Sequence, residues 1–214
     1  MLVPRDVALR FGVVSADALV SGLRNDAKLS TVSGDLVIDD VEGDLELNAV
    51  NGEISVRGHV GALAVHTVSG DITASGSIHR FTLDGVSSNV FLDLVGTPDQ
   101  IVTNSVSGNL TVRLEPPVAA RYHLNTLSGT LQLDNQTVRT AFGKGHEGST
   151  GTLDGSWLDL RSNSVSGDIS VVRRESGDTA PRGAESTSAA SAQAASRQAD
   201  AAASAAPDSP QDPT

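Results

Sequence analysis

Apolar residues recur along the first part of the chain at two fixed positions of a nine-residue unit. The units run from residue 7 to residue 87, and their third and fifth positions are apolar in every unit. The residue between these two positions is usually polar or small, as in Arg10, Lys28, Glu46 and Thr73. Alternation with a period of two is typical of a strand with one buried face. The pattern therefore predicts one short strand per unit, with turns where Gly, Asn, Asp and Ser gather at the unit boundaries.

A second period of 18 residues arises because alternate units resemble each other more closely than neighbouring units do. The phrase Val-Ser-Gly-Asp marks this period, and it or a variant begins at Val14, Val32, Val50, Val68, Val86, Val106, Leu127 and Val165. An antiparallel meander, sandwich or barrel could use the same strand spacing, but it gives no reason for alternate units to match. In a β-solenoid with two strands per coil, equivalent residues stack in columns about 4.8 Å apart. We therefore predict an all-β protein: a single-chain β-solenoid, similar to a parallel β-helix, with two short strands per 18-residue coil and about eight coils.

The repeated phrase is expected to form a corner of each coil. Its valine should point inward, the Ser or Asn beside it should hydrogen-bond the turn backbone, and its Gly should permit a tight bend. The predicted turn residues are Ser33, Gly34, Asn51, Gly52, Ser69, Gly70, Ser107, Gly108, Ser128, Gly129, Ser166 and Gly167.

The later part of the chain keeps this rhythm less strictly. Residues 96–98 and 115–117 lengthen two turns, and a Gly-rich excursion over residues 139–155 interrupts the coils. We expect residues 1–175 to form the solenoid domain. Residues 176–214 hold Ala, Ser, Pro, Gln and Asp but no large apolar residue, so we expect a disordered tail there.

Composition narrows the classes of partner. Aromatic residues are only 3% of the chain, which favours a narrow aliphatic core. The net charge of −11 argues against a nucleic-acid partner, because phosphate neutralisation needs Lys and Arg. The chain holds no cysteine, no recognisable signal peptide and no apolar run long enough to cross a membrane. We therefore expect no direct membrane insertion and, by default, a cytoplasmic location.

The phrases beginning at Thr31, Thr67 and Ser164 resemble those of an adhesin-like family of bacterial β-strand-repeat proteins, called domain of unknown function 4097. The resemblance covers about residues 3–173. It implies a β-solenoid with no established catalytic residues, and it offers the cell surface as an alternative location.

Acidic residues that follow the glycines form the most suggestive candidate site. Asp17, Asp35, Glu53 and Asp71 would stack in one column, and a calcium ion could relieve their mutual repulsion. The calcium-binding nonapeptide carries Gly-Gly-x-Gly-x-Asp, however, and no unit contains it. We therefore expect no metal and no cofactor, and instead a solvated turn whose carboxylates accept backbone amide hydrogen bonds.

Other chemistry-bearing residues lack a recognisable arrangement. His59, His66, His79, His123 and His146 fall in different units without metal-site spacing, so we expect them on the surface. The chain has no Gly-x-Ser-x-Gly elbow, and its Gly-rich segment lacks the Lys-Ser/Thr pair of a phosphate loop.

Three functional hypotheses follow. The first is a non-enzymatic scaffold that presents a long repetitive polar face to a partner of unknown identity or to copies of itself. The second is a carbohydrate-acting β-helix enzyme, which needs a cleft lined by paired carboxylates and could use the 139–155 excursion to build it. The third is an intracellular polymer-forming or regulatory scaffold.

The first coil carries Leu9, Phe11, Val14 and Val20 but no evident cap in the sequence before it. We therefore expect self-association through this end, or a cap further upstream.

Overall fold

The computed structural model of this protein describes residues 4–115, 118–133, 136–139, 145–151 and 156–174. These residues all belong to one unit, Met1–Glu175. The predicted tail, residues 176–214, lies outside the described residues. The described part of the chain is all-β and contains no helix. It follows that none of these segments is a helix that could span a membrane.

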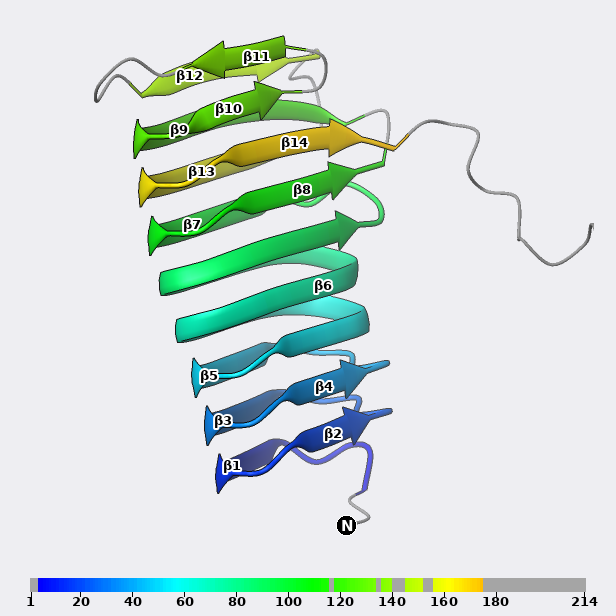
Figure 1. Cartoon of the computed structure of the whole chain (residues 1–214). Coiled ribbons are helices and arrows are strands. Elements are labelled where there is room, and N and C mark those ends of the chain that lie inside the picture. Colours follow the sequence, from blue (N-terminus) through cyan, green and yellow to red (C-terminus); the bar gives the residue numbers. More distant parts are fainter. Residues whose placement is uncertain (1–3, 116–117, 134–135, 140–144, 152–155, 175–214) are drawn as a thin grey trace, which may run out of the picture. The chain divides into compact units, whose positions relative to one another are not determined.

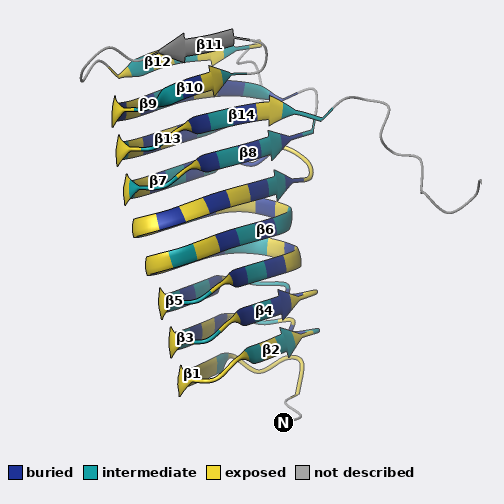
Figure 2. Ribbon diagram, viewed as in Figure 1, coloured by how far each residue is buried: buried dark blue, intermediate teal, exposed yellow. Residues whose placement is uncertain are grey.

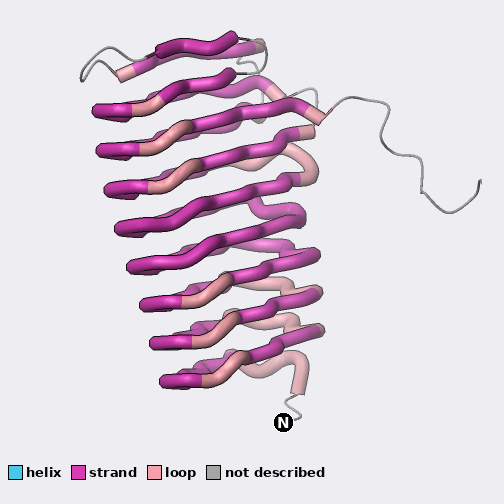
Figure 3. Tube along the Cα trace, viewed as in Figure 1, coloured by secondary structure: helices cyan, strands magenta, loops and turns pink. Residues whose placement is uncertain are grey.

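Fourteen strands of the described residues form one hydrogen-bonded sheet that winds through two facing layers (Figure 1). In chain order they are β1 (Leu9–Ser15), β2 (Ala18–Ser21), β3 (Ala27–Ser33), β4 (Leu36–Asp39), β5 (Leu45–Asn51), β6 (Ile54–Leu94), β7 (Gln100–Ser107), β8 (Leu110–Leu114), β9 (Ala119–Ser128), β10 (Thr130–Leu133), β11 (Gln136–Arg139), β12 (His146–Thr150), β13 (Trp157–Ser166) and β14 (Ile169–Arg173). Strands fill most of each turn of the stack, and only short loops separate them (Figure 3).

Parallel pairing at an offset of 18 residues builds the first part of the stack. In one layer β1 pairs with β3, β3 with β5, and β5 with β6. In the other layer β2 pairs with β4 and β4 with β6 at the same offset. Phe11, Leu29, Leu47 and Val65 are consequently register partners from strand to strand. The 18-residue period of the sequence is therefore the distance along the chain between one strand and the strand stacked on it.

The two apolar positions of the nine-residue units supply the core, as the pattern predicts (Figure 2). From β3 onward these positions are buried, and they include Leu29, Leu36, Ile38, Leu45, Leu47, Ile54, Val56, Leu63, Val65, Ile72, Ala74, Phe81 and Leu83. Burial of each large aliphatic side chain favours folding by about 1.5–3 kcal/mol. In β1 and β2, by contrast, Leu9, Ala18 and Val20 are only partly buried and Phe11 is exposed.

The valine of the repeated phrase points outward, so the prediction that it points inward is wrong. Val32, Val50 and Val68 are 40–48% exposed. The residue before each valine faces the core instead, as the buried Thr31 and Thr67 show. The reason is that the strand continues past the valine. Alternation therefore runs unbroken from the core positions, and the corner comes two residues later, at the glycine.

Spatial order departs from chain order in the later strands, where consecutive coils were expected. β13 lies between β7 and β9 and pairs in parallel with both. Likewise β14 lies between β8 and β10. In Figure 1 the yellow strands β13 and β14 accordingly lie among green strands that precede them in the chain. The chain thus leaves one place in the stack open and later returns to fill it.

Antiparallel strands cover one end of the stack. β11 pairs antiparallel with β10 in one layer, and β12 pairs antiparallel with β9 in the other. β12 and the last residue of β11 belong to the 139–155 excursion. The described part of that excursion therefore contributes edge strands, and the rest lies outside the described residues.

Glycine is required at the corner after the outward valine. Gly70 has a φ of 138°, and a Cβ built on it would lie 2.0 Å from the carbonyl oxygen of Gly52. A side chain there would clash with the backbone of the next turn of the stack. Most of the predicted turn glycines have the same geometry, with a positive φ and no room for a Cβ beside the stacked backbone.

Two valines of β6, three residues apart, point to different faces: Val65 to the core and Val68 to the outer surface. We expect Val65→Asp to destabilise the fold by more than about 4 kcal/mol, because Val65 is fully buried among apolar side chains. Val68→Asp should cost no more than about 1 kcal/mol, because Val68 is half exposed. Urea unfolding followed by circular dichroism measures both. Equal losses in the two variants would contradict the assigned orientation.

Candidate functional site

A groove follows the outer surface of the layer that contains β1, β3, β5, β7, β13 and β9. It consists of two hollows of about 620 and 460 Å³, which share Thr67 and Asp84 and so continue into each other. We call it the outer groove. Its floor contains Thr31, Ala49, Thr67, Gly85, Ser105 and Ser164.

One wall of the outer groove is apolar. It is formed by the outward valines of the repeated phrase, which we call the valine ridge: Val14, Val32, Val50, Val68, Val86, Val106 and Val165. These side chains are 40–73% exposed, and Leu127 holds the equivalent place on β9. A stripe of aliphatic side chains on the surface of an acidic protein is typical of an interaction site rather than of a solvated face.

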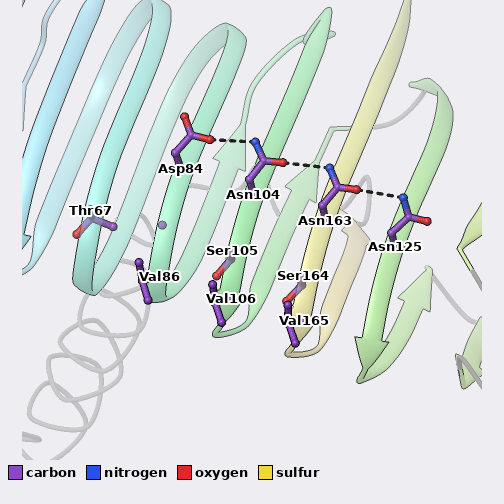
Figure 4. A pocket seen from close by; sticks show the side chains of 11 residues that line it. Thr67, Asp84, Val86, Asn104, Ser105, Val106, Asn125, Asn163, Ser164 and Val165 are labelled. Atoms are coloured by element: carbon purple, nitrogen blue, oxygen red, sulfur yellow. Dashed lines mark hydrogen bonds between the residues drawn. The ribbon is translucent and has the colours of Figure 1, made fainter. Parts of the chain in front are cut away.

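The opposite wall is polar, and we call it the polar ladder: Ser30, Asn48, His66, Asp84, Asn104, Asn163 and Asn125. Its second half is hydrogen-bonded from rung to rung (Figure 4). The Nδ2 of Asn104 donates to Asp84 Oδ1 at 2.9 Å, and the Nδ2 of Asn163 donates to Asn104 Oδ1 at 3.0 Å. Asn125 in turn donates to Asn163 at 3.0 Å.

The ladder keeps hydrogen-bonding capacity for a ligand. An Asn side chain has two N–H donors and an oxygen with two lone pairs. Asn104 and Asn163 each use one donor and one lone pair within the ladder. Within the part of the chain that the structure describes, one N–H and one lone pair therefore remain on each of these two rungs. The sequence does mark this ladder, because every rung lies two residues before the valine or leucine of the repeated phrase. It does not show the order of the four hydrogen-bonded rungs, which are 20, 59 and 38 residues apart along the chain.

Charge is nearly absent from the groove. Among the described residues that line it, the only carboxylate is Asp84, whose Oδ2 lies 3.3 Å from the Nδ1 of His66. Asp84 also accepts the hydrogen bond from Asn104. The groove can therefore bind a ligand through amides and apolar contacts, but its lining lacks the pair of carboxylates that glycoside hydrolysis uses.

A separate hollow in the same layer, outside the outer groove, is strongly charged. Its lining includes Arg10, Asp26, Lys28, Asp44, Glu46, His66 and Arg80. Two of its three acidic side chains, Glu46 and Asp26, accept hydrogen bonds. Glu46 accepts a 2.5 Å hydrogen bond from Lys28 and another from Asn48, and these bonds, Lys28 first, lower the pKa of the Glu46 carboxyl. Asp26 accepts the backbone N–H of Asp44 at 3.0 Å. Glu46 is therefore held as a paired carboxylate rather than as a poised acid or base.

The acidic column proposed as a calcium site is part of the backbone network. Asp17 accepts the N–H of Asp35 at 2.9 Å, and Asp35 accepts the N–H of Glu53 at 2.9 Å. At Asp71 the partner is the side-chain amide of Asn89, at 2.9 Å. Within the described ranges, no cluster of three or more His, Cys, Asp or Glu side chains could hold a metal ion. These carboxylates thus join one turn of the stack to the next.

The predicted turn serines and Asn51 lie at strand ends or, for Ser69, within β6. Ser33, Asn51, Ser107, Ser128 and Ser166 are each the last residue of a strand. Ser107 donates a hydrogen bond to Ser87 at 3.2 Å across two stacked strands. Each of these residues directly follows the outward valine or leucine of the repeated phrase, so together they lie along one side of the valine ridge.

His59 is fully buried, so the prediction that all five histidines lie on the surface is wrong. The 18-residue period contains the missed signal, because it aligns His59 with the buried residues Leu23 and Val41. Its Nδ1 lies 2.8 Å from the carbonyl oxygen of Val41, and its Nε2 lies 3.1 Å from that of Ala62. Burial lowers the pKa of the imidazole despite these two carbonyl oxygens. Folding therefore favours neutral His59.

Asp93 forms an ion-pair cluster away from the groove. Arg113 donates to it through Nε at 2.9 Å, and Arg174 at the end of β14 also contacts it. The hydrogen bond from Arg113 is the main cause of the lowered pKa of the Asp93 carboxyl. Because β8 lies between β6 and β14, this cluster ties the returning strand β14 to β6.

No family model, curated protein or solved structure matches this chain. The resemblance to the adhesin-like family therefore stays a prediction based on the repeated phrases alone.

Burial of His59 predicts a pH dependence of stability. Since the folded state lowers the pKa of His59, the unfolded state binds the proton more tightly, and stability should fall as pH drops below about 6.5. Urea unfolding at pH 7.5 and 5.5 measures this loss. His59→Gln should show a smaller loss than the original chain, because the titrating group is gone. The control His146→Gln, at a partly exposed position on β12, should keep the loss. An unchanged loss in His59→Gln would contradict the assignment.

Proposed function

We propose that this protein is a non-enzymatic β-solenoid scaffold whose outer groove binds an extended, uncharged polymer, and that a linear neutral polysaccharide is the best match. The solenoid interpretation is supported by parallel, in-register strands at an 18-residue offset in two facing layers. The count of about eight coils is part of this proposal.

The observation that carries the proposal is that the groove repeats with the stack. From β3 to β13 each stacked strand adds one ridge side chain and one ladder side chain, at the strand spacing of about 4.8 Å. A site built this way suits a ligand that itself repeats, because each added strand can offer another contact of the same kind.

The chemistry of the two walls indicates the ligand class. The amides of Asn104 and Asn163 can donate to and accept from hydroxyl groups. Valine side chains of the opposite wall can pack against the C–H surface of a sugar ring. Nearly uncharged walls give no advantage to a polyanion, and the net charge of −11 opposes one.

The enzyme hypothesis has less support from the described residues. It needs two free carboxylates that face a substrate, and the groove lining offers Asp84 alone, already paired with His66 and Asn104. The described part of the 139–155 excursion lies along β9 and β10 as edge strands. An open-ended polymer is also less favoured, because those strands cover one end of the stack.

Binding to a panel of soluble neutral polysaccharides tests the proposal. We expect isothermal titration calorimetry to detect binding of at least one neutral glycan, such as a β-glucan, dextran or mannan, and none of alginate. The double variant Asn104→Ala/Asn163→Ala should lower the affinity about tenfold, the value expected for two lost hydrogen bonds. The matched control Gln132→Ala removes an exposed amide on β10, outside the groove, and should bind normally.

Two outcomes would overturn this function. One is failure of every neutral glycan to bind a folded protein. The other is binding that survives in Asn104→Ala/Asn163→Ala at full affinity, which would place the ligand elsewhere.

A further inference from the structure

The two ends of the stack differ in how their edges are covered. At one end, β11 and β12 pair antiparallel with the last strands of both layers. At the other end, the described residues give β1 no partner besides β3, and β2 none besides β4. We call this the β1–β2 end. Each of its two strands presents one row of backbone N–H and C=O groups without a strand partner, which is a template for pairing with another strand.

Apolar side chains at the β1–β2 end continue the core. Phe11 is a register partner of the fully buried Leu29, yet Phe11 is 38% exposed. A hollow of about 510 Å³ beside it is lined by residues that include Leu9, Phe11, Val20 and Leu23. The segment before β1 lies beside the corner, where Arg5 accepts the backbone N–H of Arg24 at 2.8 Å. Among the described residues, the core column thus ends at Phe11 with apolar surface still open.

We propose that a second copy of this chain covers the β1–β2 end, so that the protein is a head-to-head dimer. A two-fold axis perpendicular to the two layers would bring β1 of each copy into antiparallel pairing with β1 of the other. The same axis would pair β2 with β2. This inference is independent of what the outer groove binds.

The covered end of the same molecule provides the precedent for this geometry. There, the last strand of each layer pairs with an antiparallel strand: β10 with β11 and β9 with β12. The two-fold axis reverses the strand direction while it keeps each strand in its own layer, so it produces the same arrangement at the β1–β2 end.

Register also fits. When the axis passes beside Phe11, the Phe11 side chains of the two copies face each other, and Leu9 faces Val13. Directly opposed residues of an antiparallel pair point to the same face, so all three core-facing positions of β1 remain on the core side.

Charge and symmetry favour a closed pair. Together β1 and β2 contain a single charged residue, Arg10, and the hollow at this end adds one charge of each sign, Arg5 and Asp17, although the chain carries a net charge of −11. Two copies can therefore approach through these strands with little like-charge repulsion. An isologous contact of this kind uses the same surface on both copies and stops at two.

Molecular mass in solution tests the dimer. We expect sedimentation velocity and light scattering of the full chain to show a dimer at tens of micromolar. Phe11→Asp should give a folded monomer, because it places charges on the two-fold axis. Phe91→Asp is the matched control, because Phe91 is equally exposed, at 38%, but lies on the outer face of β6. The Phe91→Asp variant should therefore remain a dimer.

A cross-link makes the test independent of whether Phe11→Asp folds. The chain has no cysteine, so Phe11→Cys introduces a single thiol, which should oxidise rapidly to a disulfide-linked dimer across the axis. Phe91→Cys should cross-link far more slowly. A monomeric original chain up to several hundred micromolar would overturn the proposal. So would a persistent Phe11→Asp dimer, or equal cross-linking rates for the two cysteine variants.

Discussion

In-register parallel pairing is the interaction on which the rest of this structure depends. Because each strand bonds to the strand 18 residues away in the first part of the chain, every residue lies on its own equivalent in the repeat. Aliphatic residues therefore form buried columns, glycines meet at the corners, and carboxylates reach the amides of the next turn. A single register thus fixes the core, the corners and the outer face together.

The sequence alone predicted the parts of this fold that repeat with a fixed period. The buried columns from Leu29 to Leu83 follow from alternation and the 18-residue period. The outward orientation of Val68 does not follow from the phrase itself, because the corner lies two residues later, at Gly70. The burial of His59 follows only from its 18-residue alignment with the buried Val41. The position of β13 could not be predicted, since its Val-Ser-Gly-Asp phrase fits equally well anywhere in the stack.

The return of β13 into the stack also explains why the order of the ladder's last rungs could not be predicted from the sequence. Asn163 bridges Asn104 and Asn125 only because β13 lies between β7 and β9. A repeat that tolerates exchange of its coils can therefore assemble surface ladders from distant segments. In this protein the result is a nearly uncharged groove on an acidic chain, with one wall of amides and one of valines.

Disulfide trapping tests this register and strand order most directly, in a chain that has no cysteine of its own. Residues opposite each other on neighbouring strands lie about 4.8 Å apart, which is within reach of a disulfide. When another strand lies between the two, the distance is about 9.6 Å, which is too long. The account predicts that the pair Asn104→Cys/Asn163→Cys forms an intramolecular disulfide and that Asn104→Cys/Asn125→Cys does not. Efficient closure of the second pair, with failure of the first, would contradict it and restore consecutive coils.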